Sequence, residues 1–214
     1  MSLYDVKPKF RQLLMPAADR LRRVPPDAIT MAGVLASIVA LGCIAGSIAH
    51  RWLLLLVPVW LAVRISCNAL DGLVAHRAGR ARPFGEVVNE GADRLADLIL
   101  LLGLGLTAWA SLPIAAVASV AVLLASYTGL IGKSVGSGRE HGGILGKADR
   151  MVWLGLTALV AWHVGPAPVT VGGRQWTSVF ELMLGLFVPL SLVTAAQRVA
   201  RIHAHLRISG GPDA

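Results

Sequence analysis

Acidic residues are concentrated in one short part of this sequence, where their types and spacing could bind a cation. Of twelve acidic residues, five fall in a stretch of under thirty positions: Asp71, Glu86, Glu90, Asp93 and Asp97. At 100° per residue, five side chains would share about 100° of one helix face: Glu86, Asn89, Glu90, Asp93 and Asp97. Asn68 and Asp71 are three residues apart, so they would share a face of the preceding helix.

Carboxylates gathered in this way repel one another unless a cation lies between them. Hard, oxygen-rich sites favour Mg²⁺, Mn²⁺ or Ca²⁺. A carboxylate at a membrane edge is costly unless it is paired, hydrated or bound to metal. The alternative is a solvated acidic loop, which the shared helix face disfavours. The spacing therefore predicts a functional site that binds a divalent cation.

The composition places these residues in a membrane protein. Of the 214 residues, 55% are hydrophobic and only 15% are charged, whereas a soluble domain has about a quarter charged residues. A spanning helix needs about 20 mostly apolar residues. Six segments are candidates: 29–49, 52–74, 95–112, 113–131, 151–164 and 176–196. We therefore predict an all-α, polytopic membrane protein with six transmembrane helices.

The basic residues predict its orientation. With six spans, both termini share one side with two of the loops, and that side carries 17 of the 20 basic residues. The positive-inside rule makes this side cytoplasmic, so a bacterial inner membrane protein with both termini in the cytoplasm is expected. The net charge of +8 is thereby explained without nucleic acid. Four tryptophans near the predicted outer ends would form an interfacial belt: Trp52, Trp109, Trp162 and Trp176.

The sequence divides into three predicted parts. Residues 1–24 form an interfacial amphipathic helix, broken or kinked at Pro8 and Pro16, whose basic residues would lie on anionic headgroups. Its apolar stripe consists of Leu13, Leu14, Ala17, Ala18 and Leu21. Residues 25–200 form the six-helix membrane domain, and residues 201–214 form a cytoplasmic tail.

The spacing of the polar residues resembles the signature of the CDP-alcohol phosphotransferase family, D-x2-D-G-x2-A-R-x8-G-x3-D-x3-D. At these positions the chain has Asn68, Asp71, Gly72, Ala75, His76, Gly85, Asn89 and Asp93. Asn68 and Asn89 replace the first and third aspartates, and His76 replaces the arginine, with Arg77 beside it. Asparagine at the first and third of these aspartate positions resembles a bacterial branch of the family, whose members carry N-A-L-D-G followed by L-N-E-x2-D-x3-D.

Two further segments extend the resemblance. Residues 26–30, PDAIT, are similar to the P-N-x-I-T entry to the family's first span. Gly146 and Lys147 are similar to the start of the family's G-K-x-K-T stretch, from which Ala148, Asp149 and Arg150 depart.

The resemblance implies a transferase of phospholipid biosynthesis. It would move a phosphatidyl or related group from a CDP-activated lipid, CDP-diacylglycerol, to an alcohol and release CMP. One or two divalent ions, Mg²⁺ or Mn²⁺, would hold the diphosphate, and Asp93 would be the general base. The donor would contact Gly72, Ala75, His76, Arg77 and Gly85. The acceptor would contact Lys147 and Arg150, and a homodimer is expected.

The two asparagines alter the expected metal site, because each supplies a neutral oxygen where the family has a charged one. We expect Asp71, Asp93 and Asp97 as ligands, with Asn68, Asn89 or Glu90 completing the shell. Two other functions stay open. One is a catalytically impaired relative that binds lipid or nucleotide or acts as a scaffold, and the other is a small transporter, which does not explain the signature spacing. Glycerol phosphate, inositol phosphate, serine and a lipid alcohol all stay open as acceptors.

Overall fold

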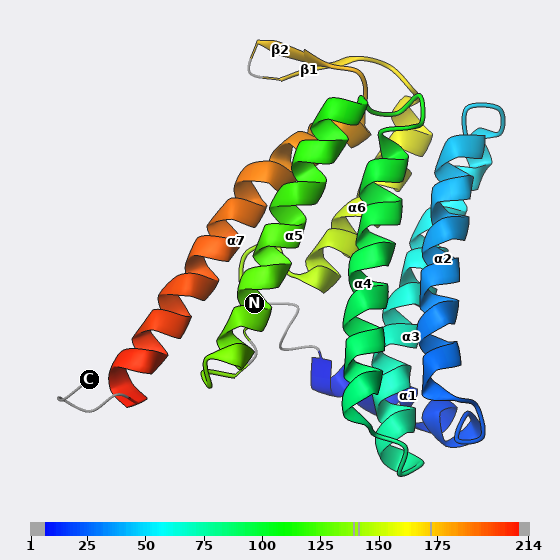
Figure 1. Cartoon of the computed structure of the whole chain (residues 1–214). Helices are drawn as coiled ribbons and strands as arrows, with labels where there is room; N and C mark the ends of the chain where they lie inside the picture. Colours follow the sequence, from blue (N-terminus) through cyan, green and yellow to red (C-terminus); the bar gives the residue numbers. More distant parts are fainter. Residues whose placement is uncertain (1–6, 139, 141, 172, 210–214) are drawn as a thin grey trace.

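A computed structural model describes residues 7–138, 140, 142–171 and 173–209. Within these residues the chain forms seven α-helices, one 3-10 helix and a two-stranded hairpin (Figure 1). In order they are α1 (Lys7–Arg20), α2 (Pro26–Gly46), η2 (Arg51–Leu56), α3 (Val57–Arg77), α4 (Pro83–Leu104), α5 (Leu112–Ser134), α6 (Lys147–Val164), β1 (Val169–Val171), β2 (Arg174–Trp176) and α7 (Val179–Ser209).

Proline fixes the starts of four helices. Pro26 and Pro83 are the first residues of α2 and α4, while Pro58 and Pro113 are the second residues of α3 and α5. Proline is favoured here because its backbone has no N–H to leave unpaired and its φ already suits a helix. The start of α6 is fixed differently, since the Asp149 carboxylate accepts a hydrogen bond from the Gly146 amide at 2.8 Å.

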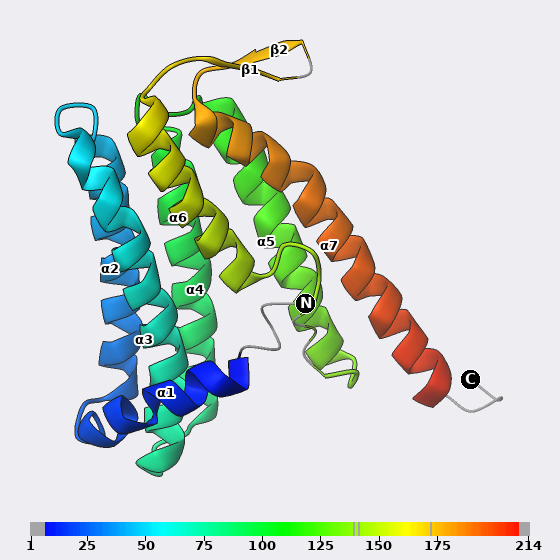
Figure 2. The same cartoon turned by 180° about the vertical axis from the view of Figure 1, so that it is seen from behind.

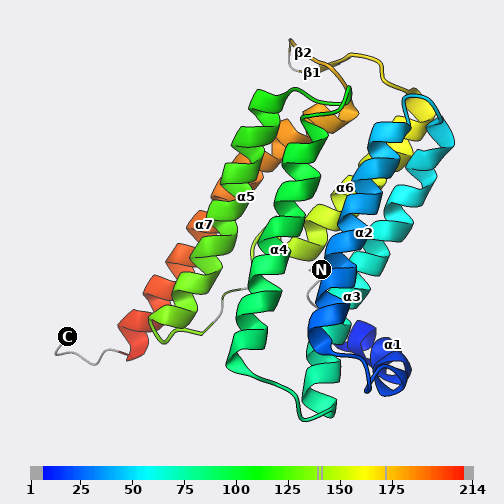
Figure 3. The ribbon, with the colours of Figure 1, turned by 45° about the vertical axis from the view of Figure 1, so that its right-hand side comes forward.

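The six longer helices form a bundle, and α1 lies across one of its ends (Figure 2). Helix α2 packs against α3 and α4, α5 packs against α7, and α6 lies between α3 and α7 (Figure 3). The hairpin lies at the end opposite α1 (Figure 1). Its strands are antiparallel, with Val169 paired to Trp176. The prediction of an all-α fold missed this hairpin, and α7 begins after it, at Val179.

Four helical segments in the described chain are long and apolar enough to cross a membrane: Pro26–Gly46, Arg51–Arg77, Leu112–Ser134 and Val179–Ile208. Helices α4 and α6 were also predicted to span, but each carries several charged residues. Helix α4 also runs from Pro83 to Leu104, although the apolar run predicted 95–112. The helix begins before the apolar run does, because its first turns include several polar residues and Pro83 favours the start of a helix.

Helix α1 is amphipathic as predicted and continues through Pro16. Most of its apolar stripe contacts protein, while Leu13 is 75% exposed, and the interfacial position of the helix stays a prediction. Ala18 is fully buried, and Leu14, Ala17 and Leu21 pack against a cluster that includes Leu70, Leu73 and Val74 of α3. Burying these side chains against α3 removes more apolar surface from water than a loose surface helix would. Residues 1–6 and 210–214 of the predicted terminal parts lie outside the described residues.

The position of Trp109 and the end of α7 differ from what the apolar runs suggested. Trp109 is fully buried rather than interfacial. Its indole donates to the Ile44 carbonyl at 3.1 Å and to Ser47 Oγ at 2.9 Å, and its ring meets Phe180 edge to face. An indole can be buried here because its N–H is paired. Helix α7 continues to Ser209, so the predicted tail at 201–214 is helical up to that residue. Its cytoplasmic location stays a prediction.

Candidate active site between α2, α3, α4 and α6

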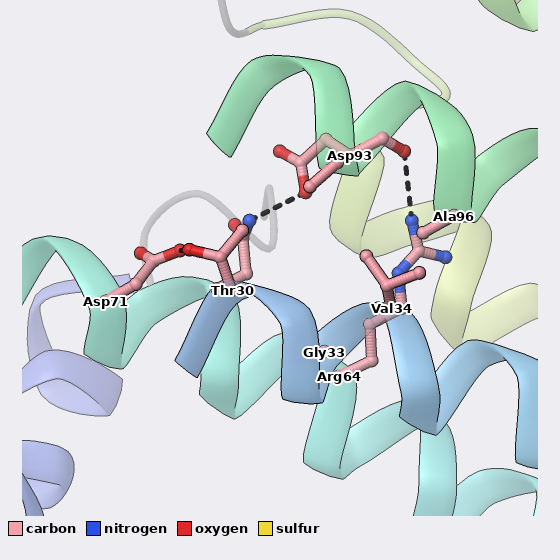
Figure 4. Close-up of a pocket in the computed structure, with 9 residues that line it drawn as sticks. Thr30, Gly33, Val34, Arg64, Asp71, Asp93 and Ala96 are labelled. Carbon is pink, nitrogen blue, oxygen red and sulfur yellow. Dashed lines mark hydrogen bonds between the residues drawn. The ribbon is translucent and has the colours of Figure 1, made fainter. Parts of the chain in front are cut away.

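A small pocket lies between α2, α3 and α4. It is lined by Thr30, Gly33, Val34, Arg64, Asn68, Asp71, Ala92, Asp93 and Ala96. Figure 4 shows Asp71 from α3 and Asp93 from α4 on its two sides, with Thr30 of α2 beside Asp71. Two carboxylates that the motif spacing singled out therefore line the same pocket, although 22 positions separate them in the sequence.

Asp71 is held in place by two hydrogen bonds. Its Oδ2 atom accepts from the Thr30 hydroxyl at 2.8 Å, and its Oδ1 atom accepts from the Gly72 amide at 2.6 Å. Asp71 is only 3% exposed. A buried carboxylate is expensive unless it is hydrogen-bonded, and these donors reduce that cost. Thr30 was missed as a site residue, although its place in the PDAIT segment marked it.

Asp93 is contacted by two donors. Its Oδ1 atom accepts from Asn68 Nδ2 at 2.7 Å and forms an ion pair with the ammonium group of Lys147, the first residue of α6. The same Asn68 nitrogen lies 3.0 Å from Asn89 Oδ1. The two asparagines at the aspartate positions of the motif therefore contact each other, and Asn68 orients Asp93.

Beyond Asp93 lies a buried network of three charged side chains from α3, α4 and α6. Arg64 Nη2 is 2.6 Å from Asp97 Oδ1, and Arg150 Nη2 is 2.8 Å from Asp97 Oδ2. All three side chains are at most 3% exposed. Arg64 also contacts the Met151 sulfur at 2.9 Å, and its Nη2 lies 3.4 Å from the Asp93 carbonyl oxygen. Removing one partner of such a group leaves a buried charge uncompensated.

Three of the expected site residues form ion pairs, two of them within this network. Asp97 was expected to bind metal, yet each of its oxygens accepts from a guanidinium group. Arg150, expected at the acceptor, is the partner of Asp97. Glu90, an expected ligand, forms a 2.6 Å ion pair with Arg94 one helical turn away. Arg64, a basic residue within a predicted span, pairs inside the bundle.

The residues expected to contact a donor lie near the end of α3 and the start of α4. Gly72 borders Asp71, and a Cβ atom there would meet no other atom within 4 Å. Ala75 is partly exposed and His76 is exposed. Arg77 instead contacts α1, where it pairs with Asp19 and lies 3.2 Å from the Met15 sulfur. Gly85 lies in the first turn of α4, close to Arg82.

The donor set fits one divalent cation better than two. In the part of the chain that the structure describes, no three Asp, Glu, His or Cys side chains gather closely enough to hold an ion. The pocket instead offers the carboxylates of Asp71 and Asp93, and the Asn68 amide nitrogen donates to Asp93 and to Asn89 Oδ1. Mg²⁺ commonly binds through one or two carboxylates, with substrate phosphates completing its shell. These residues therefore fit one ion that is shared with a phosphate group.

Known proteins similar to this chain include membrane proteins and lipid synthases. The inner membrane protein YnbA of Escherichia coli is 30% identical over 200 residues, which cover 92% of this chain and 94% of YnbA. The archaetidylinositol phosphate synthase of Methanothermobacter thermautotrophicus is 29% identical over 165 residues, or 77% of this chain and 80% of that protein. The chain matches none of the protein-family models with which it was compared.

The fold is shared with a solved structure. The phosphatidylinositol phosphate synthase of Mycobacterium tuberculosis with bound CDP-DAG superposes with a TM-score of 0.66 over 89% of this chain and 94% of the synthase, at 22% identity. The same synthase in complex with manganese and citrate gives a TM-score of 0.61, at 20% identity, over 88% of each chain.

Proposed function

Since the chain belongs to the CDP-alcohol phosphatidyltransferase family, we propose that it transfers a phosphatidyl group from CDP-diacylglycerol to an alcohol and releases CMP. The observation that carries the proposal is that Asp71 and Asp93, which keep their places in the motif, line one pocket. The fold similarity to a synthase solved with CDP-DAG supports the choice of donor.

Asp93 is the proposed general base. In the reaction, the acceptor oxygen forms a bond to the phosphorus that carries the lipid, and the bond from that phosphorus to the CMP oxygen breaks. Asp93 takes the proton of the acceptor hydroxyl, because its carboxylate faces the pocket and Asn68 holds it in one orientation. A correctly placed base of this kind contributes about 10²–10⁴-fold to a rate.

Asp71 and Asp93 would hold a divalent cation, Mg²⁺ or Mn²⁺. Asn68, whose amide nitrogen donates to Asp93 and to Asn89, would keep the Asp93 carboxylate in place. When bound, such an ion neutralises charge on the diphosphate and on the departing CMP. Asp97 and Glu90 are left out of this set because arginine side chains already pair with them. The proposed role of Asp97 is to position helices α3, α4 and α6, whereas Glu90 pairs within α4.

The donor would lie over the exposed ends of α3 and α4. Gly72 leaves open space beside Asp71, so the diphosphate can approach the backbone there. Ala75, His76 and Gly85 would border the nucleotide, and Lys147 would lie between the donor phosphate and the acceptor. Arg77 would act indirectly, by holding α1 against α3. The two similar archaetidylinositol phosphate synthases make inositol phosphate the first acceptor to test.

The proposal includes a topology. The integral membrane protein would cross the membrane six times, with α4 and α6 as the third and fifth spans and residues 25–200 as the transferase domain. The polar residues of these two helices would be covered by neighbouring helices. Both termini would face the cytoplasm, as the distribution of basic residues predicts, and the similar YnbA is an inner membrane protein. A homodimer stays an expectation.

The test is a measurement of CMP release by the purified protein in lipid nanodiscs. It would use CDP-diacylglycerol, Mg²⁺ or Mn²⁺, and a panel of acceptors that includes inositol phosphate, glycerol phosphate, serine and a lipid alcohol. Asp93→Asn should abolish metal-dependent CMP release. Glu86→Gln is the matched control, because Glu86 pairs with Lys133 on the surface of the protein. Absence of CMP with every acceptor would contradict the proposal.

A second function has one structural observation in its favour. Lys147 and Asn68 already contact one oxygen of Asp93, Oδ1, which makes that oxygen less available to accept a proton. A relative that only binds CDP-lipid would bind the donor without releasing CMP, and Asp93→Asn would not change that binding. Donor binding measured alongside CMP release separates the two functions.

A further inference from the structure

The charged side chains in and around the pocket balance one another without any bound ion. Three are acidic and three are basic: Asp71, Asp93, Asp97, Arg64, Lys147 and Arg150. All except Lys147 are less than 9% exposed. Asp149 lies close by, at the start of α6, where the positive end of the helix stabilises its charge. A buried group of carboxylates with matched cations has little need of a resident metal ion.

Lys147 is the residue that completes this balance. Its ammonium group contacts Asp93 Oδ1 and is buried, although the side chain as a whole is 27% exposed, so Lys147 reaches into the buried group from its edge. It is held there as the first residue of a helix whose start Asp149 caps. A divalent cation bound at the same oxygen would be repelled by the ammonium group, since like charges a few ångströms apart interact strongly in a poorly hydrated site.

The charge of the proposed donor limits the number of divalent cations that the pocket can bind. A diphosphate that is esterified at both ends, as in a CDP-lipid, carries two negative charges, which one divalent cation neutralises. A second divalent ion would leave an excess of positive charge in a site that is already balanced. We infer that Lys147 provides the positive charge at Asp93, and that the pocket binds a single divalent cation only together with the nucleotide diphosphate. This inference rests on the proposed function.

The test counts bound Mn²⁺ by electron paramagnetic resonance on the purified chain in nanodiscs. Without nucleotide, the wild-type chain should bind no Mn²⁺ above the level of empty nanodiscs. With CDP-diacylglycerol it should bind one Mn²⁺ per chain. Two ions per chain with donor, or tight binding of Mn²⁺ without donor, would overturn the inference.

Two variants test the role of Lys147 itself. Asn68→Asp combined with Lys147→Met exchanges a neutral group for a carboxylate and removes the competing ammonium group. Its affinity for Mn²⁺ without nucleotide should rise by about tenfold or more, as expected when a like charge leaves a buried site. Asn68→Asp combined with Lys147→Arg keeps the positive charge and should show a clearly smaller gain. Equal gains in both variants would show that Lys147 does not oppose the ion.

The control is Asn68→Asp combined with Lys133→Met, which removes a lysine that pairs with Glu86 at the surface. Its affinity for Mn²⁺ without nucleotide should equal that of Asn68→Asp alone. Donor binding, followed separately with labelled CDP-diacylglycerol, distinguishes failure of the proposed function from failure of the inference about Lys147. If no donor binds, the proposed function fails, while the measurements without nucleotide still decide the role of Lys147. If donor binds with two ions, the function stands and the inference fails.

Discussion

Arg64 of α3 and Asp97 of α4 form an ion pair of 2.6 Å inside the bundle, where their side chains are 3% and 2% exposed. Arg150 of α6 takes the other oxygen of Asp97. One carboxylate thus joins three helices whose contacts also shape the pocket. We conclude that Asp97 contributes mainly to the arrangement of these helices.

Asp97→Asn should therefore destabilise the protein strongly. It would leave two buried guanidinium groups without a charged partner, and loss of one member of a buried ion pair costs about 3–5 kcal/mol. Asp27→Asn is the matched control, because Asp27 also pairs with an arginine, Arg82, but both side chains are at least 40% exposed. Such a surface pair contributes about 0–1 kcal/mol. Thermal unfolding in detergent measures the stability of both variants. An equal loss of stability in the two would contradict the structural role of Asp97.

Gly72→Ala should separate donor binding from stability. A Cβ atom at Gly72 meets nothing within 4 Å, and alanine favours a helix over glycine by about 1 kcal/mol. We therefore expect unchanged or slightly higher stability, together with weaker binding of CDP-diacylglycerol, because the added methyl group lies where the diphosphate would approach. Gly91→Ala is the control, since Gly91 is equally open but is not one of the motif residues expected to contact the donor. Equal donor affinity in the two variants would remove Gly72 from the donor site.

The sequence predicted the part of the site that depends on local spacing. Asn68 and Asp71 share one helix, Asn89 and Asp93 share the next, and the motif indicated that the two helices face each other. The partners of Asp97 could not be predicted in this way, because Arg64 and Arg150 are 33 and 53 positions away. Helical periodicity places Asp97 on the same face as Asp93, yet only the packing of α6 decides which cation reaches it.

The burial of Trp109 could not be predicted from its neighbours in the sequence either. A tryptophan near the end of an apolar run usually predicts an interfacial position. Here the carbonyl of Ile44 and the hydroxyl of Ser47 pair with its N–H. Both belong to the end of another helix, so the residues around Trp109 give no sign of its burial.

Asp19 and Arg77 should keep α1 against α3. Asp19→Asn or Arg77→Ala removes their ion pair and should loosen α1, which covers a cluster against which Cys67 packs. The chain has two cysteines, so labelling by a maleimide can be compared within one molecule. Cys67 should label faster in the variants, while Cys43, in the main core, should not change. An unchanged rate at Cys67 would show that apolar contacts alone hold α1.

The pH dependence of this contact follows from its charge. The hydrogen bond from Arg77 lowers the pKa of the Asp19 carboxyl below its ordinary value. The stabilisation that the Asp19–Arg77 ion pair gives to the α1 contact is therefore complete above the ordinary pKa of an aspartate. It is lost only as the pH falls through the lowered pKa of Asp19. Spin labels at the exposed residues Leu13 and Phe84 should report one α1 position from pH 8 to pH 5. A change of position within that range would contradict this assignment.

Thr30→Val should lower donor turnover with little change in packing. Valine keeps the shape of threonine but removes the hydroxyl that donates to Asp71. A hydrogen bond to a charged group contributes about 1.5–3 kcal/mol, so the position of Asp71 should become less defined and CMP release should fall by about tenfold or more. Thr30→Ser keeps the hydroxyl and should retain most of the rate. Equal rates for the two variants would show that the hydroxyl is not needed.

The ion pairs of Asp97 border an apolar region as well as the pocket. On their far side lie Leu100, Leu101, Leu154 and Phe187, which belong to the main core. If the pocket assembles lipid as proposed, this apolar region lies between a charged headgroup made there and the part of the bundle beyond Asp97. Each new molecule would stay in the leaflet where it was made, and a cell that needs it in both leaflets would depend on a separate flippase or scramblase.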